Sequence, residues 1–328
     1  MDKIKNFFKE NYKFIIILLI ILFIFWCPLP YYVDAPGGLT NLDSKIDIDN
    51  ASIDGSYNLT YVSEYKASIP LLIYSLFNKD YDIYKKEDIL LENETDDEYN
   101  KRDKLFLKES LSNAVIASYN MAGKSITIKN NYLYVGYILN NSETDLKVGD
   151  EIKSIDDIKV TTKEEVNSLL SNKSVGDRIT IEVTNNNKNY TRYAILHEED
   201  DKKIIGIIPI EVFDYEANPK VEIKMDANES GSSGGLMLSL AIYDLLSDDN
   251  LAQGRKIAGT GTIDSNGNVG EIGGIEYKIK GAVKDKADLF LVPVENYEEA
   301  VKVKKDNNYK IKIIKVRTLK EAISYLKK

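Results

Sequence analysis

The chain has 328 residues, with 43 Lys and Arg against 52 Asp and Glu, a net charge of −9, one histidine and one cysteine. This length exceeds the usual size of one domain, so two or three compact units are expected. The acidic balance, with no basic stripe outside the N-terminal tail, argues against a nucleic acid as partner. The single Cys27 excludes an intrachain disulfide and a thiolate metal site.

The first predicted element is an apolar helix near the N-terminus. Residues 14–33 carry no charge, and a helix of that length, at about 1.5 Å per residue, spans about 30 Å of hydrocarbon. Residues 1–13 carry four lysines against two acids. The positive-inside rule therefore predicts a cytoplasmic tail at 1–13 and a single transmembrane helix at 14–33, with the rest of the chain outside a bacterial cell. A cleavable signal peptide is the alternative, but no small-x-small cleavage site follows.

Residues 34–128 are predicted to form an N-terminal part of the extracytoplasmic region that packs with the domain at the C-terminus. Alternation and helical spacing predict strands at 46–48 and 57–62 and helices at 68–77 and 103–122. The charged run at 85–102 is interpreted as a solvated loop, because its acids lack the regular spacing of cation ligands.

Residues 122–125 read Ala-Gly-Lys-Ser, like the end of a phosphate-binding loop. The first glycine of such a loop would fall at Ser118, and no strand precedes it. The sequence therefore predicts no nucleotide site and no ATPase unit.

A second unit is predicted at residues 129–198, where short alternating strands surround one helix at 162–170. This succession, and above all LKVGDEIKSIDDIKV at 146–160, resembles a PDZ domain of the bacterial kind. The resemblance implies that an extended peptide adds a strand to a sheet edge, opposite the helix. The edge expected to bind it consists of Val135, Gly136, Tyr137 and Ile138. The alternative is a structural spacer whose groove is never occupied.

The clearest chemical signal is a glycine turn with serines at residues 229–237, which leads into an apolar helix predicted at 236–246. A serine hydroxyl becomes a nucleophile only when a nearby base takes its proton. Gly234 and Gly235 would let the backbone approach a substrate, and they would begin a helix whose N–H groups face a developing oxyanion.

The candidate base is Lys278, 45 residues after Ser233 and at the start of another predicted helix. A lysine acts as a base only when it is neutral, which requires burial to lower its pKa from about 10.4. Isoleucines on both sides of Lys278 supply an apolar surrounding. Since His197 is the only histidine, a Ser-His-Asp arrangement has little support. These residues predict a Ser/Lys peptidase.

The same motifs resemble the proteolytic domain of the Lon family, and its membrane-anchored, PDZ-containing members that lack the ATPase. Residues 231–236 match the family's nucleophile turn, and 257–263, 267–275 and Lys278 follow in the family's order. The resemblance covers residues 204–328.

This resemblance implies that Ser233 is the nucleophile, Lys278 the general base and Thr260 a hydroxyl partner that orients the lysine. The family's turn is Gly-Pro-Ser-Ala-Gly, whereas here Ser232 replaces the proline and Gly234 the alanine. The turn is therefore less rigid, and Ser232 is a rival nucleophile. Ser233 is preferred because it keeps the spacing to the apolar helix.

Other candidate groups fit the expected chemistry less well. Lys280 is a rival base, but it lies two residues too far from the preceding glycine pair. Residues 264–268 are interpreted as a hairpin turn and not as a calcium loop. His197 and its acidic neighbours lack the spacing of metal ligands. The sequence predicts no metal and no cofactor.

Together these features predict a mixed α+β protein with a transmembrane helix, a β-rich PDZ-like domain and a Lon-type α/β proteolytic domain. The predicted function is that of a membrane-anchored, extracytoplasmic serine endopeptidase that needs no ATP. Its expected partners are peptides or unfolded and secreted proteins, recruited by the PDZ domain. Relatives of this fold assemble into rings, so a homo-oligomer is a further expectation. Two alternatives stay open: an inactive, membrane-tethered PDZ scaffold, and an enzyme whose serine works with His197 and a distant acid.

Overall fold

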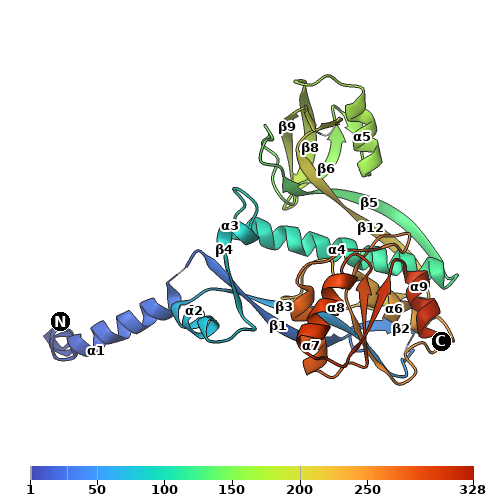
Figure 1. Ribbon diagram of the computed structural model, residues 1–328. Helices are drawn as coiled ribbons and strands as arrows, with labels where there is room; N and C mark the ends of the chain where they lie inside the picture. The colour runs from blue at the N-terminus through green and yellow to red at the C-terminus, as the bar shows by residue number, and fades with distance from the viewer. Residues whose placement is uncertain (1, 28, 50, 200) are drawn as a thin grey trace.

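The computed structural model describes residues 2–27, 29–49, 51–199 and 201–328. Two separate β-sheets organise the chain (Figure 1). A mixed sheet is formed by strands from both ends of the sequence, and an antiparallel sheet is formed by the middle. The long helix α4 (Asp96–Met121) runs between the two (Figure 1). The prediction of a mixed fold of helices and strands is confirmed.

Helix α1 (Asp2–Trp26) projects from the rest of the molecule (Figure 1). The predicted span 14–33 is wrong in extent, because the helix ends at Trp26 and the chain enters strand β1 at Tyr31; residue 28 lies outside the described residues. The uncharged part of α1 has thirteen residues, about 20 Å of helix against about 30 Å of hydrocarbon. Among the described residues, no helix combines the length and apolar character needed to cross a membrane.

The mixed sheet has the strand order β18-β17-β14-β3-β1-β4. Its strands are β1 (Tyr31–Asn41), β3 (Ser56–Lys66), β4 (Asp82–Lys85), β14 (Lys256–Gly259), β17 (Leu289–Pro293) and β18 (Lys312–Val316). Strands β3, β14, β17 and β18 are parallel to one another, whereas β1 is antiparallel to both β3 and β4. The N-terminal part of the chain therefore completes the sheet that the C-terminal part begins.

Helices cover both faces of the mixed sheet. These are α6 (Gly235–Leu246), α7 (Ile275–Lys284), α8 (Tyr297–Asp306) and α9 (Leu319–Leu326), together with α4. On β14, Ile257 belongs to the core shared with α4, α6 and α9, whereas Ala258 belongs to the core shared with α7 and α8. This division follows from the alternation of side chains along a strand. Helix α6 is buried on all sides, as expected for a helix without a polar face.

The antiparallel sheet has the order β12-β5-β6-β8-β9 and its own hydrophobic core, so it forms a separate domain. Its elements are β5 (Ser125–Ile138), β6 (Glu151–Ile155), β7 (Ile158–Lys159), α5 (Lys163–Ser171), β8 (Arg178–Asn185), β9 (Lys188–Ile195) and β12 (Ile207–Asn218). Strand β12 pairs with β5 along its whole length, so residues 207–218, which the sequence assigned to the domain that follows, are part of this sheet.

The charged run at 85–102 is not the solvated loop that the sequence suggested. Its second half opens α4, where the Thr95 side chain accepts from the N–H of Glu98 and the Glu98 carboxylate accepts from the N–H of Thr95. This capping box satisfies free N–H groups of the first turn. Acidic residues in that turn also interact favourably with the positive end of the helix dipole. The clustered acidic residues therefore lie at the N-terminal end of α4.

Short elements complete the fold. They are β2 (Ile46–Ile48), α2 (Ile69–Leu76), α3 (Lys86–Ile89), β10 (His197–Glu199), β11 (Lys202–Ile204), β13 (Val221–Ile223), β15 (Thr262–Ile263) and β16 (Val269–Gly270). Strand β13 pairs with β2, so the segment that leads to the serine turn is tied to the N-terminal part of the chain.

Candidate active site

The serine turn, residues 231–235, connects an irregular segment to the buried helix α6. Gly231 has φ +82°, a value that favours glycine. At Gly235 a Cβ atom would lie 2.7 Å from the side chain and 3.0 Å from the backbone nitrogen of Ile263. The turn therefore packs tightly against β15, and glycine is required where α6 begins.

Backbone contacts hold Ser233 beside the end of β14. Its carbonyl accepts from the N–H of Gly261 at 2.8 Å and from the hydroxyl of Thr260 at 3.1 Å. Leu236, the second residue of α6, donates to the carbonyl of Gly261 at 3.0 Å. These hydrogen bonds hold the peptide group of Ser233 next to the residues that follow strand β14.

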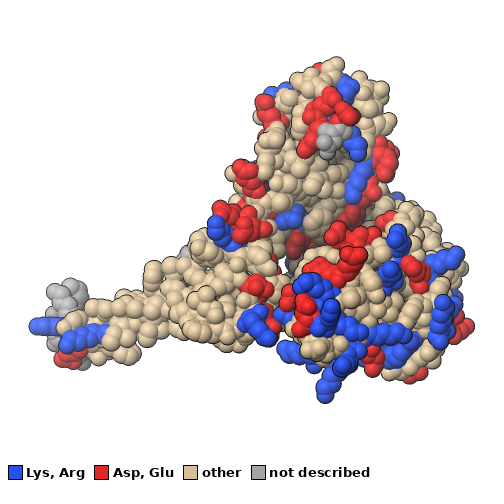
Figure 2. Space-filling model, in the orientation of Figure 1, with Lys and Arg blue, Asp and Glu red and all other residues tan. Residues whose placement is uncertain are grey.

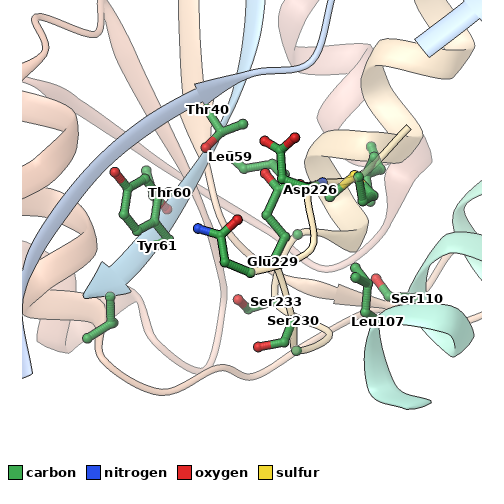
Figure 3. Close-up of a pocket in the computed structure, with 16 residues that line it drawn as sticks. Thr40, Leu59, Thr60, Tyr61, Leu107, Ser110, Asp226, Glu229, Ser230 and Ser233 are labelled. Atoms are coloured by element: carbon green, nitrogen blue, oxygen red, sulfur yellow. The ribbon is translucent and has the colours of Figure 1, made fainter. Parts of the chain in front are cut away.

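Ser233 lines a cavity of about 370 Å³ between the mixed sheet and α4. Figure 3 shows Thr40 and Tyr61 on one side of this cavity and Leu107 and Ser110 of α4 on the other. The segment before the turn contributes Asp226, Glu229 and Ser230 (Figure 3). The Ser233 region is therefore accessible to a ligand the size of a few residues.

Lys278 lies in the first turn of α7 and is 4% exposed. Its Nζ donates to Oγ1 of the buried Thr260 at 3.3 Å. Burial lowers the pKa of Lys278 to about 8, because a low-dielectric surrounding disfavours the ammonium form. Ile275 and Ile279, both fully buried, flank it as the sequence suggested. The structure thus brings Lys278, Thr260 and Ser233 together.

The rival residues have a different surrounding. Lys280 forms ion pairs with Asp80 at 2.9 Å and Glu276 at 2.8 Å. Although its burial favours the neutral form, these two carboxylates raise the pKa of Lys280, so it is a poor base at neutral pH. Ser232 is not among the residues that line the cavity, whereas Ser233 is. The cavity lining thus favours Ser233 over Ser232, and the ion pairs of Lys280 favour Lys278 as the candidate base.

The turn also offers donors for an oxyanion. The N–H of Gly235 bonds to the carbonyl of Ser232 at 3.2 Å, and that of Leu236 bonds to Gly261. Within the described part of the chain, no hydrogen bond uses the N–H of Ser233 or Gly234. Of the two glycines named in the sequence analysis, Gly234 therefore has the unused backbone N–H, and Gly235 allows the turn to pack closely against β15.

Asn296 is a site residue that the sequence did not reveal. It is 3% exposed and bonds twice to the backbone of Ile272, through its side-chain oxygen at 3.0 Å and its nitrogen at 2.9 Å. This pair of bonds holds the segment that precedes α7 and Lys278. No local pattern marks it, because the two residues meet only through the fold.

The edge predicted to bind peptide, at Val135–Ile138 of β5, is occupied by the chain itself. Strand β12 pairs with this stretch on one side, and on the other Val135 donates to Asp150 and accepts from Gly149, both at 2.8 Å. Val135 is therefore paired on both sides, whereas Tyr137 and Ile138 pair with β12. The end strands of the sheet are β12 and β9, and a cavity of about 450 Å³ lies between α5 and residues 201–204, just before β12.

His197 lies on β10 in the antiparallel domain, where its ring is next to Gly206. It does not line the Ser233 cavity. Among the described residues no group of three or more His, Cys, Asp or Glu side chains is arranged to hold a metal ion.

Two segments of the chain match known protein families. Residues 126–193 match the PDZ domain family, and residues 219–327 match the Lon protease (S16) C-terminal proteolytic domain. The Lon protease of Campylobacter jejuni is 32% identical over 126 residues, which are 38% of this chain and 16% of that protein. The Lon protease of Neorickettsia sennetsu is 26% identical over 98 residues, 30% of this chain and 12% of that protein. The chain thus matches less than a fifth of the length of these relatives.

Among solved structures, the PDZ domain of the SdrC-like protein from Listeria monocytogenes is similar at 22% identity and a TM-score of 0.21. The match covers 25% of this chain and 90% of that one.

Proposed function

We propose that this chain, which carries a PDZ domain and a Lon-type proteolytic domain, is a serine endopeptidase that uses Ser233 and Lys278 and needs no ATP. One observation carries the proposal: the hydroxyl of Thr260 joins the buried amine of Lys278 to the peptide of Ser233. A lysine with a pKa of about 8 is neutral in roughly a tenth of the molecules at pH 7. This fraction is sufficient for general-base catalysis.

In the proposed reaction, neutral Lys278 takes the proton of Ser233 as its oxygen attacks the carbonyl carbon of a peptide bond. The resulting oxyanion is stabilised by the N–H of Gly234 and by the N-terminal end of α6. The Lys278 ammonium then returns the proton to the leaving amine, and an acyl-enzyme remains on Ser233. Water, deprotonated by Lys278, hydrolyses this ester and restores the enzyme.

An extended substrate that binds beside strand β3 would reach Ser233. Strand β14 pairs with β3 only along Ser56–Leu59 of β3, whereas β3 continues to Lys66. Beyond Leu59, Tyr61 and Val62 line the cavity that contains Ser233. A peptide that adds a strand to this open part of β3 would bring its backbone past the nucleophile.

The proposed role of the PDZ domain is to recruit the substrate. One of its two end strands is β12, and the groove near the start of β12 is lined by Asn167 and Ser171 of α5 and by Lys202–Ile204. Main-chain bonds to an edge strand bind extended peptides with little dependence on their sequence. Peptides and unfolded proteins are therefore the proposed substrates.

Location outside the cytoplasm and attachment to a membrane remain proposals. Helix α1 exposes large apolar side chains, among them Phe23, Phe25 and Trp26. On the face seen in Figure 2, charged residues of this projection occur only toward its N-terminal end. Fractionation of cells, followed by protease treatment of intact cells, would test this location.

A direct experiment compares the purified chain with three variants on an unfolded protein substrate, without ATP. Ser233→Ala and Lys278→Met should abolish cleavage, whereas Ser232→Ala should retain most of it. Equal cleavage by the wild type, Ser233→Ala and Lys278→Met would refute the assignment. Peptide binding without cleavage would favour the alternative of a membrane-tethered scaffold.

A further inference from the structure

The serine turn has no residue that fixes its own backbone. Residues 231–235 read Gly-Ser-Ser-Gly-Gly, and neither serine nor glycine restricts φ as proline does. Glycines lose the most conformational freedom when they are ordered. Contacts from outside the turn must therefore hold Ser233 in one place.

One face of α4 supplies such contacts. Ser110 donates its hydroxyl to the carbonyl of Ser232 at 3.1 Å, the residue immediately before Ser233. Asp103 accepts through its carbonyl from the N–H of Gly231 at 3.0 Å, and Lys104 donates to the carbonyl of Glu229 at 3.0 Å. Positions 103, 104, 107 and 110 lie on one side of a helix, and Leu107 and Ser110 of this side line the cavity (Figure 3).

The contact at Ser110 is the most constrained of these. Ser110 is 2% exposed, so water does not compete for its hydroxyl. A Cβ atom at Gly235 would lie 3.0 Å from Ser110 Oγ, which shows how closely helix and turn pack. The carbonyl of Ser232 also accepts from Gly235 at 3.2 Å, so Ser110 completes the hydrogen bonding of this peptide group.

We infer that Ser110 is a positioning residue of the peptidase: through Ser232 it fixes the peptide that carries the nucleophile. Helix α4 lies outside both matched segments, 126–193 and 219–327, so the Lon-type domain here is completed by a helix from elsewhere in the chain. This inference rests on the proposed function. Ser110 acts by geometry, and a displacement of about 1 Å at a nucleophile can reduce the rate up to about a hundredfold.

Ser112 offers a matched control. It lies two residues further along α4 and is 3% exposed, but its oxygen accepts from the N–H of Phe213 on β12 at 3.3 Å and its hydroxyl donates to the carbonyl of Glu109 at 3.1 Å. Among the described residues, none of its hydrogen bonds reaches the serine turn. Ser110→Ala and Ser112→Ala thus remove the same group from the same helix at the same depth. Only Ser110→Ala removes a hydrogen bond to the serine turn.

The test measures kcat and KM of the full chain on a fluorogenic peptide, with urea unfolding of each variant. For Ser110→Ala we expect kcat to fall about tenfold with KM changed by less than about twofold, while Ser112→Ala stays within about twofold of the wild type. Equal kcat in the two variants would overturn the inference. The inference would also be overturned if Ser110→Ala lost both kcat and stability against urea while Ser112→Ala kept its stability, because unfolding would then explain the lost activity.

A second measurement does not depend on activity. Hydrogen–deuterium exchange of the peptide covering residues 226–236 should be several times faster in Ser110→Ala than in the wild type, and unchanged in Ser112→Ala. Unchanged exchange in Ser110→Ala would contradict the inference whether or not the chain cleaves peptides. If cleavage persists in Ser233→Ala, by contrast, the proposed function fails while the structural role of Ser110 is still decided by exchange.

Discussion

The amine of Lys278 lies 3.3 Å from Oγ1 of Thr260, and the same hydroxyl donates to the carbonyl of Ser233 at 3.1 Å. Thr260 therefore accepts a hydrogen bond on one side and donates one on the other. All three residues come from different elements, since Lys278 is on α7, Thr260 follows β14 and Ser233 precedes α6. The hydroxyl fixes where the lysine points in a buried site.

Thr260→Val tests this role, because it keeps the shape of the side chain and removes the hydroxyl. The amine of Lys278 would lose the partner that orients it, so kcat/KM should fall by about ten- to a hundredfold. Thr260→Ser keeps the hydroxyl and should remain within about fivefold of the wild type. Steady-state kinetics on one peptide substrate checks both; a valine variant as active as the serine variant would refute the orienting role.

The dependence on pH should reveal the lysine. Only neutral Lys278 can accept a proton, and its pKa is lowered by burial to about 8. Activity should therefore rise with increasing pH and reach half its limit near pH 8, as measured from kcat/KM. Loss of cleavage in His197→Ala, with cleavage retained in Lys278→Met, would instead support the alternative in which histidine is the base.

Lys278→Met should stabilise the protein at neutral pH. The pKa of Lys278 falls from 10.5 to about 8 on folding, so the unfolded chain binds more protons between these values and stability rises with pH there. Below pH 8 the full cost of the buried charge is present, about 3 kcal/mol. Urea unfolding at pH 7 should show a gain of about 2 to 3 kcal/mol that shrinks toward pH 10.5. A loss of stability at pH 7 would contradict the account.

Gly235→Ala should disrupt the serine turn. The added methyl group would meet Ile263 at 2.7 Å, and overpacking of this kind costs about 1 to 3 kcal/mol. We expect cleavage to be lost and the midpoint of thermal unfolding to fall. Gly273→Ala is the control, because a Cβ atom there has no neighbour within 4 Å. Equal losses of cleavage and of thermal stability in Gly235→Ala and Gly273→Ala would contradict a specific role for close packing at Gly235.

Much of the structure around the candidate site could be predicted because it lies in short, contiguous motifs. The helix predicted at 236–246 is observed as Gly235–Leu246, since glycines before an apolar run mark a buried helix. Lys278 was expected to be buried because isoleucines flank it at helical spacing, and it is. The two family matches confirm the resemblance to PDZ and Lon proteolytic domains.

The remaining features depend on long-range pairing. That β5 is an inner strand follows from its register with β12, more than sixty residues away, and register is set by tertiary packing. Strand β3 pairs with β14 across about two hundred residues and connects β1 to the same sheet. The bonds of Ser110 to Ser232 and of Asn296 to Ile272 leave no trace in a local pattern. The acidic residues at 96–98 led to the wrong prediction of a solvated loop, because clustered charges occur both in loops and in the first turn of capped helices.

The most direct test follows modification of the enzyme by a serine-reactive fluorophosphonate, with mass spectrometry to locate the adduct. The account predicts an adduct on Ser233, formed at a rate that reaches half its limit near pH 8, and almost no modification of Lys278→Met. An adduct on Ser232, or a rate that Lys278→Met leaves unchanged, would contradict it.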